Sequence, residues 1–92
     1  MVYVKILIDA HTLERAEERG TNEVEIKDVI NTGAPIPAKY NRLGKAKIYP
    51  FQGQRHGKFY QQKKVEVFYL MGKDFVITVT VYVFYGKWEE VK

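Results

Sequence analysis

The sequence has no cysteine and few of the other residues that bind metals. Without cysteine, disulfide bonds and thiolate metal sites are both excluded. Only two histidines are present, and no group of His, Asp and Glu has the spacing of metal ligands. We therefore expect no metal and no other cofactor.

Signals for secretion and for membrane insertion are lacking as well. The first five residues have neither the basic segment of a signal peptide nor its apolar run and small-residue cleavage site. The longest apolar run, near residues 75–85, is too short and too rich in Thr and Tyr to cross a bilayer as a helix. These absences predict a cytoplasmic protein with no membrane partner.

What is present is the composition of a folded domain. The chain has 92 residues, of which 46% are hydrophobic and 28% charged, as is typical of globular proteins rather than disordered ones. A chain of this length has no room for a second core. We therefore expect residues 1–92 to form a single domain, with one sheet and one layer of helices.

The net charge of +4 is unevenly distributed. Residues 9–28 are mainly acidic, whereas residues 39–64 contain no acid and eight bases, which are Lys39, Arg42, Lys45, Lys47, Arg55, Lys58, Lys63 and Lys64. Six aromatic or imidazole rings are interspersed among these bases. Cations that neutralise phosphates, together with rings that stack on bases, are typical of proteins that bind single-stranded nucleic acid. The alternative is a solvated, Lys-rich loop and hairpin whose rings fill the core.

The N-terminal third predicts a strand followed by two short helices. Val2–Ile8 is β-branched and aliphatic, as strands are. Asp9 or its neighbour can cap a helix that runs to about Arg19 and ends at Gly20 in the left-handed conformation. Helical spacing gives this helix a narrow packing face, which consists of Ala10, Leu13 and Ala16 or Glu17.

A second helix follows, capped by Thr21 or Asn22, with Glu25 placed for a capping box if Asn22 is the cap. Its apolar side consists of Ile26, Val29 and Ile30, and it ends at residues 31–33. Residues 34–44, which contain two prolines, are expected to form a loop.

The remaining residues predict antiparallel strands. A strand is expected over Lys45–Phe51, with an edge or bulge at Pro50, and Gln52–Gly57 is expected to be a turn or mobile loop. Lys63–Met71 and Phe75–Tyr85 form a hairpin joined by residues 72–74. Alternation along the last strand predicts one face against the helices, formed by Phe75, Ile77, Val79, Val81 and Val83, and a second face formed by Val76, Thr78, Thr80, Tyr82 and Phe84.

Three side chains of the first helix share its solvent side, because residues three and four apart are neighbours there. They are His11, Arg15 and Glu18. Imidazole moves protons near neutral pH, and guanidinium binds phosphate in a planar fork. The pair therefore suits chemistry on a phosphate. The alternatives are a histidine that merely caps backbone groups and an arginine in a surface ion pair.

The order of these elements resembles a known family. The resemblance rests on a strand, a helix with His11 and Arg15, the Arg19-Gly20 stop, a second helix and a closing strand with Thr80-Val81-Tyr82. The family that the chain resembles is called Domain of Unknown Function 4258. Its members resemble small toxins of the RelE/BrnT group. The resemblance implies an α+β, RelE-like fold, in which an N-terminal strand and two short helices accompany a mainly antiparallel four-stranded sheet, with both helices on one face.

The resemblance also implies an RNA-directed, toxin-like protein, for which a metal-independent endoribonuclease is one activity and an antitoxin one partner. In that chemistry the ribose 2′-hydroxyl attacks the adjacent phosphorus, while side chains transfer protons and stabilise charge. His11 would transfer protons, Arg15 would stabilise phosphate, and Tyr82 would bind substrate or orient His11. The residues expected to bind nucleic acid are Arg19, Arg42, Lys45, Lys47, Arg55, His56 and Lys58.

Two other functions fit the same residues. One is a non-catalytic module that binds nucleic acid or a protein through the basic stretch. The other is a homo-oligomer that uses an edge or the uncovered face of its sheet as an interface.

Overall fold

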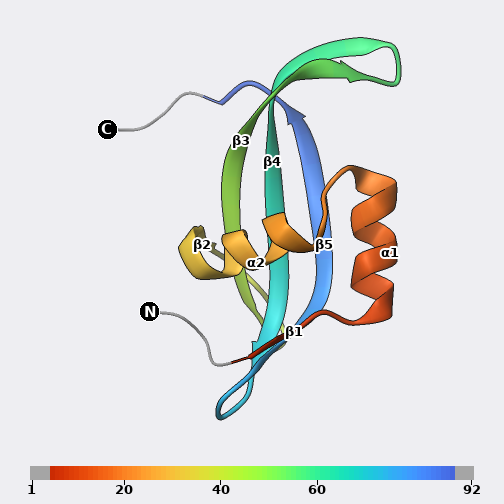
Figure 1. Cartoon of the computed structure of the whole chain (residues 1–92). Helices are drawn as coiled ribbons and strands as arrows, with labels where there is room; N and C mark the ends of the chain where they lie inside the picture. The colour runs from red at the N-terminus through yellow and green to blue at the C-terminus, as the bar shows by residue number, and fades with distance from the viewer. Residues whose placement is uncertain (1–4, 89–92) are drawn as a thin grey trace.

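A computed structural model describes residues 5–88 and shows an α+β fold, in which two helices pack on one face of a five-stranded sheet (Figure 1). The elements are β1 (Ile6–Leu7), α1 (Ala10–Arg19), α2 (Glu23–Thr32), β2 (Ala34–Ile36), β3 (Leu43–Arg55), β4 (Lys58–Met71) and β5 (Val76–Gly86). The strand order is β1-β5-β4-β3-β2, with β1 parallel to β5 and all other pairs antiparallel.

The α+β class and the placement of both helices agree with the sequence prediction, but the number of strands does not. The sheet has five strands rather than four, because residues 34–36 pair with β3 instead of remaining in a loop. Of the strand predicted over Val2–Ile8, only Ile6 and Leu7 pair with β5, and residues 2–4 lie outside the described residues. Neither helix has more than ten residues, and no described helix is long and apolar enough to span a membrane.

The two ends of α1 are as predicted. The side chain of Asp9 caps the N-terminus by accepting a hydrogen bond from the backbone of Thr12, and it also accepts one from the hydroxyl of Thr78 on β5, at 3.1 Å. Burial alone would raise the pKa of Asp9, but hydrogen bonds from the hydroxyls of Thr12 and Thr78 and from the Thr12 backbone outweigh it and lower the pKa. At the other end, Gly20 has a φ of 95°, the left-handed conformation that glycine adopts without strain.

The packing face of α1 differs from the prediction. Ala16 is buried as expected, but the second buried residue is Thr12, whereas Leu13 is 40% exposed and Ala10 and Glu17 face solvent. Hydrogen bonds explain why Thr12 is buried in place of Leu13. The hydroxyl of Thr12 donates to Asp9, which also accepts from β5, and these bonds fix the rotation of the helix against the sheet.

The start of α2 is linked both to α1 and to β4. Asn22 is the cap, and its side chain accepts from the backbone of Glu25 at 2.9 Å. The Glu25 carboxylate accepts from the Thr21 hydroxyl and pairs with Lys63 at 2.8 Å. Lys63, only 9% exposed, also donates to the carbonyl of Gly20. This buried lysine therefore holds the ends of both helices to β4.

The segment expected to be a mobile loop is instead the end of a long hairpin. β3 continues to Arg55 and β4 begins at Lys58, so only His56 and Gly57 form the turn. Both have positive φ, 53° and 80°, as in the type I′ turn that matches the right-handed twist of paired strands. The bulge expected at Pro50 is confirmed, since the register shifts between Pro50 and Gly53. Beyond it the hairpin bends toward the side of α1 (Figure 1).

A second bulge changes which residues of β5 face the helices. Phe68 pairs with Thr80 and Tyr69 with Thr78, so Val79 is an extra residue on β5. The prediction is therefore right for Val81 and Val83, which lie on the helix side, and wrong before the bulge. There the buried residues are Val76 and Thr78, while Phe75 and Ile77 belong to the other set.

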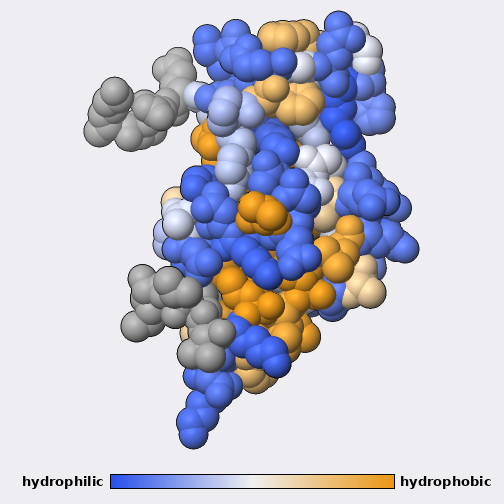
Figure 2. Space-filling model, viewed as in Figure 1, coloured by the Kyte–Doolittle hydropathy of each residue, from blue (hydrophilic) through white to orange (hydrophobic). Residues whose placement is uncertain are grey.

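The core lies between the helices and one face of the sheet. Its buried members are Ala16, Ile26, Val29, Ile30, Val65, Val67, Tyr69, Val76 and Val81. The α2 residues among them are those that the sequence predicted. On this helix-covered side an apolar patch remains below α2, where β1 joins the sheet (Figure 2).

Candidate nucleic-acid interface

The face of the sheet opposite the helices carries a row of aromatic rings. We call this side the open face, and its central ladder pairs are Phe68 with Thr80, Glu66 with Tyr82 and Lys64 with Phe84. The Tyr82 ring packs edge-on to Phe68 at 5.9 Å between centroids and is stacked with Phe84 at 6.5 Å. Tyr82 and Phe84 are 41% and 46% exposed. Large rings that stay this exposed are available to a ligand.

Cations lie over and beside these rings. The guanidinium of Arg19 is 5.0 Å from the centroid of Tyr82, and its Nη1 donates to the carbonyl of Val81 at 2.6 Å. The Lys64 ammonium is 5.8 Å from the Phe84 ring and 5.5 Å from Trp88. Lys64 also has a long ion pair with Glu66, at 3.5 Å.

The open face continues into a hollow beside the 37–42 loop. Arg42 lies over the Tyr40 ring at 5.7 Å, and both line this hollow together with Phe68 and Tyr82. Rings and cations from the loop and from two strands thus form one continuous surface. Such a surface suits a flexible chain of flat, anionic units.

A second concave site lies where the end of α1 meets the β3–β4 hairpin. We call it the hairpin groove. It has a volume of about 270 Å³ and is lined by Arg19, Arg55, His56, Tyr60, Val83 and Tyr85. Arg55 donates to the carbonyl of Glu18 at 2.6 Å and lies 5.1 Å from the centre of the Tyr85 ring. Because Arg19 contacts Tyr82 and also lines this groove, it connects the groove to the open face.

Gly20 allows this part of the groove to form. The Tyr85 hydroxyl donates to the carbonyl of Arg19 at 2.6 Å, and burial raises the pKa of Tyr85. A Cβ on Gly20 would lie 2.1 Å from that hydroxyl and 3.1 Å from Nη1 of Arg55. Glycine is therefore needed here for its conformation and for the close approach of both side chains.

The three residues expected to be catalytic do not form one site. His11 is exposed in the first turn of α1, and Arg19 lies eight residues further on, about 12 Å at the rise of an α-helix. Arg15 pairs with Glu18 at 3.0 Å and with Glu14 at 3.7 Å, which is the surface ion pair considered as the alternative. Tyr82 contacts Arg19, and no contact among the described residues joins it to His11 or Arg15.

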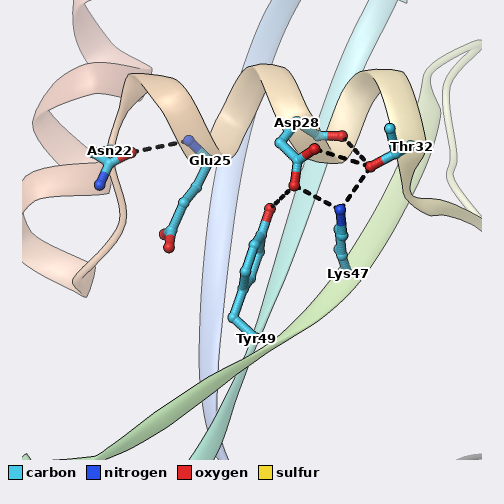
Figure 3. A network of polar contacts seen from close by, with 6 residues as sticks. All are labelled: Asn22, Glu25, Asp28, Thr32, Lys47 and Tyr49. Atoms are coloured by element: carbon cyan, nitrogen blue, oxygen red, sulfur yellow. Dashed lines mark hydrogen bonds and ion pairs between the residues drawn. The ribbon is translucent and has the colours of Figure 1, made fainter.

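Two of the lysines expected to bind nucleic acid face the helices. Lys45 donates to the carbonyl of Ile30 at the end of α2, at 2.8 Å. Lys47 donates to Asp28 at 2.7 Å and to the hydroxyl of Thr32 at 2.8 Å (Figure 3). Strand alternation places them on the opposite side from Lys64, so a run of bases that is continuous in sequence is divided between two faces.

The network around Asp28 holds α2 on β3. Tyr49 donates to the same carboxylate at 2.6 Å, so one aspartate joins two side chains of β3 (Figure 3). The hydrogen bonds from Lys47 and Tyr49 lower the pKa of Asp28 to about 2. Burial, with the bond to Asp28, raises the pKa of Tyr49. This cluster is a structural anchor.

The remaining expected residues lie near the groove or the open face. Arg19, Arg55 and His56 share the groove, Lys58 is next to it with its ammonium 5.7 Å from the Tyr60 ring, and Arg42 borders the open face. The sequence prediction did not link Phe68, Phe84 or Tyr85 to nucleic acid, and it placed Tyr60 and Lys64 in the basic stretch without assigning them to the site. A signal for part of this set was present, since alternation placed Tyr82 and Phe84 on one face of β5.

Comparisons with known proteins found no relative of this chain. No family model matches the chain, and no curated protein or solved structure gives a match. Within residues 5–88 no three His, Asp or Glu side chains lie together in a group that could hold a metal ion.

Proposed function

We propose that this protein binds single-stranded RNA on the open face of its sheet, without cleaving it. The observation that carries the proposal is the surroundings of Tyr82, an exposed ring packed between Phe68 and Phe84 and covered on one side by Arg19. Stacking on such rings contributes about 1–3 kcal/mol per base and tolerates any sequence. RNA is the polymer that the family resemblance implies.

Charge supports an anionic polymer as the ligand. Arg19, Arg42 and Lys64 lie beside the rings, and the only acid at the central ladder positions is Glu66, next to Lys64. The whole chain has a charge of +4. A duplex presents its bases already stacked on each other, so the rings favour a single strand.

The geometry of the expected catalytic residues supports binding without turnover. Tyr82 contacts Arg19, which lies eight residues beyond His11 on α1, and Arg15 is paired with two glutamates. RNA incubated with the protein in a chelator should therefore be recovered intact. Cleavage under these conditions that is lost in His11→Ala would contradict this part of the proposal and assign activity to α1.

Binding is tested by fluorescence anisotropy with a labelled single-stranded RNA of about twelve nucleotides. Tyr82→Ala and Phe84→Ala should each weaken binding by about 1–3 kcal/mol, or about 5- to 150-fold, because each removes a stacking surface. If three cations contact phosphates, log K should fall with log salt with a slope of about −2.

Val24→Ala is the matched control, because Val24 is an apolar side chain on α2 that is 77% exposed and far from the open face in the fold. It should bind RNA as the unmodified protein does. Affinity that is unchanged in both ring variants, or that does not depend on salt, would contradict the proposal. If sedimentation instead shows concentration-dependent association that the ring variants abolish, the open face is an interface between copies of the chain.

A further inference from the structure

The hairpin groove contains two guanidinium groups and no carboxylate. Arg19 and Arg55 line it with His56 and Tyr60, and none of the lining residues is acidic. Among residues 5–88, neither arginine forms an ion pair. The cations that do form ion pairs there are Arg15, Lys27, Lys47, Lys63 and Lys64. The groove therefore concentrates positive charge that the protein itself does not neutralise.

Both guanidiniums are held in place by neutral partners. Arg19 donates to a carbonyl of β5 and lies over Tyr82, while Arg55 donates to a carbonyl of α1 and lies over Tyr85. Each of these bonds uses one of the five N–H donors of a guanidinium, so further donors remain. A pair of arginines that is already ordered loses little side-chain entropy when an anion binds.

Two more polar groups face the same space. His56 occupies the first position of the turn, and the hydroxyl of Tyr60 forms no hydrogen bond among the described residues. Arginine forks, an imidazole and a hydroxyl are the side chains that bind phosphate oxygens. The chemistry of the groove is thus that of a phosphate site.

We infer that the hairpin groove binds the terminal phosphate of the RNA strand whose bases lie on the open face, an inference that rests on the proposed function. A terminal phosphomonoester has three free oxygens and a charge of about −1.5 to −2 at neutral pH. A phosphodiester within the strand has one charge and two free oxygens, so two arginines without acidic partners match the strand end better. Arg19, which contacts both sites, joins the terminal phosphate to the first stacked base.

The test compares three unlabelled RNAs of one sequence as competitors of a labelled probe. One has hydroxyls at both ends, one a 5′-phosphate and one a 3′-phosphate. At least one phosphorylated strand should bind about tenfold more tightly than the hydroxyl-ended strand, and the comparison shows which end is recognised. Equal affinity of all three strands would overturn the inference while leaving binding on the open face intact.

Variants then show which residues cause this gain, the tighter binding of the phosphorylated strand relative to the hydroxyl-ended strand. Arg55→Gln should remove it and leave the affinity for the hydroxyl-ended strand within about twofold, whereas Tyr82→Ala should weaken binding of every strand. Lys27→Gln, which removes the same charge from an ion pair on α2, should leave the gain intact. A gain that survives in Arg55→Gln would show that the phosphate binds elsewhere.

A second variant tests the same site with a substitution that keeps the fold, so that a loss of the gain is not due to unfolding. His56→Asn keeps the turn, because Asn-Gly is the preferred pair for a type I′ turn, and it removes the imidazole. It should reduce the gain about two- to threefold, and an undiminished gain would exclude His56 from the site.

Inorganic phosphate followed by NMR separates the two proposals. Shifts of the Arg19, Arg55 and His56 side-chain signals are expected. Their appearance in a protein that binds none of the RNAs would reject the nucleic-acid function and keep a phosphomonoester site. Their absence would reject the groove.

Discussion

At the scale of single residues, the fold depends on a few charged side chains that are fully engaged. Asp28 accepts hydrogen bonds from Lys47 and Tyr49 on β3, and Lys63 connects Glu25 to the carbonyl of Gly20. Both lysines belong to the basic stretch that the sequence alone links to nucleic acid. Their partners come from α2 or the turn before it, so composition could not distinguish them from Arg42 or Lys64. The distinction required the strand register.

Asp28 should make stability sensitive to acid. Its pKa is lowered from 3.8 to about 2 in the folded state, so the stabilisation is complete above about pH 4 and is lost as the pH falls toward 2. Asp28→Asn should reduce the free energy of unfolding at pH 7 by on the order of 1 kcal/mol, since the site is partly exposed.

Denaturant titrations at pH 7 and at pH 2 measure this effect. The difference between Asp28→Asn and the unmodified protein should be present at pH 7 and nearly absent at pH 2. The control is Glu17→Gln, which removes an exposed carboxylate of α1 and should leave stability unchanged. A difference of equal size at both pH values would show that the carboxylate charge contributes nothing.

At the scale of elements, local signals predicted helix ends and turns well. Gly20 ends α1 as the sequence indicated, Asp9 and Asn22 are caps among the candidates that it gave, and the tight connection after Met71 is present. The bulge at Val79 could not be predicted, since no Gly or Pro marks it and only the pairing with β4 reveals it. The two glycines and the polar side chains of Gln52–Gly57 suggested a loop. The two-residue turn was not predicted, because it needs a positive φ at His56, which is uncommon for a residue other than glycine.

Gly20 and Gly57 both have a positive φ, but a side chain would meet a neighbouring side chain only at Gly20. Gly57 has a φ of 80° and nothing within 4 Å of an added Cβ, whereas at Gly20 the added atom would meet Tyr85. Gly57→Ala should therefore destabilise the protein by about 1–2 kcal/mol, the cost of a left-handed residue with a side chain. Gly20→Ala should cost at least about 1 kcal/mol more, because the hydroxyl of Tyr85 must move.

Thermal and chemical unfolding of both variants measures this difference. Gly20→Ala should also displace Arg55 from the groove and remove the gain in RNA affinity that a terminal phosphate gives. Gly57→Ala should retain this gain. Equal stability of the two variants would show that Tyr85 and Arg55 are not seated against the end of α1.

At the scale of the whole molecule, the two faces of the sheet differ in what their side chains do. The helix side contains the core and the engaged lysines Lys45, Lys47 and Lys63, and the open face carries Tyr82 and Phe84. The fold class and the nucleic-acid hypothesis come from the sequence, and so does the choice of Tyr82. The rest of the proposed interface does not, because the sequence joined Tyr82 to two residues of α1, where the structure shows an exposed histidine and a paired arginine.

The most direct test of this division is NMR mapping with single-stranded RNA on isotopically labelled protein. Ring and backbone signals of Phe68, Tyr82 and Phe84 should shift progressively with added RNA, and signals of α2 residues such as Val24 should not. Shifts centred on α2 and β1, or no shifts at RNA concentrations that saturate the anisotropy signal, would contradict the assignment of the open face as the RNA-binding surface.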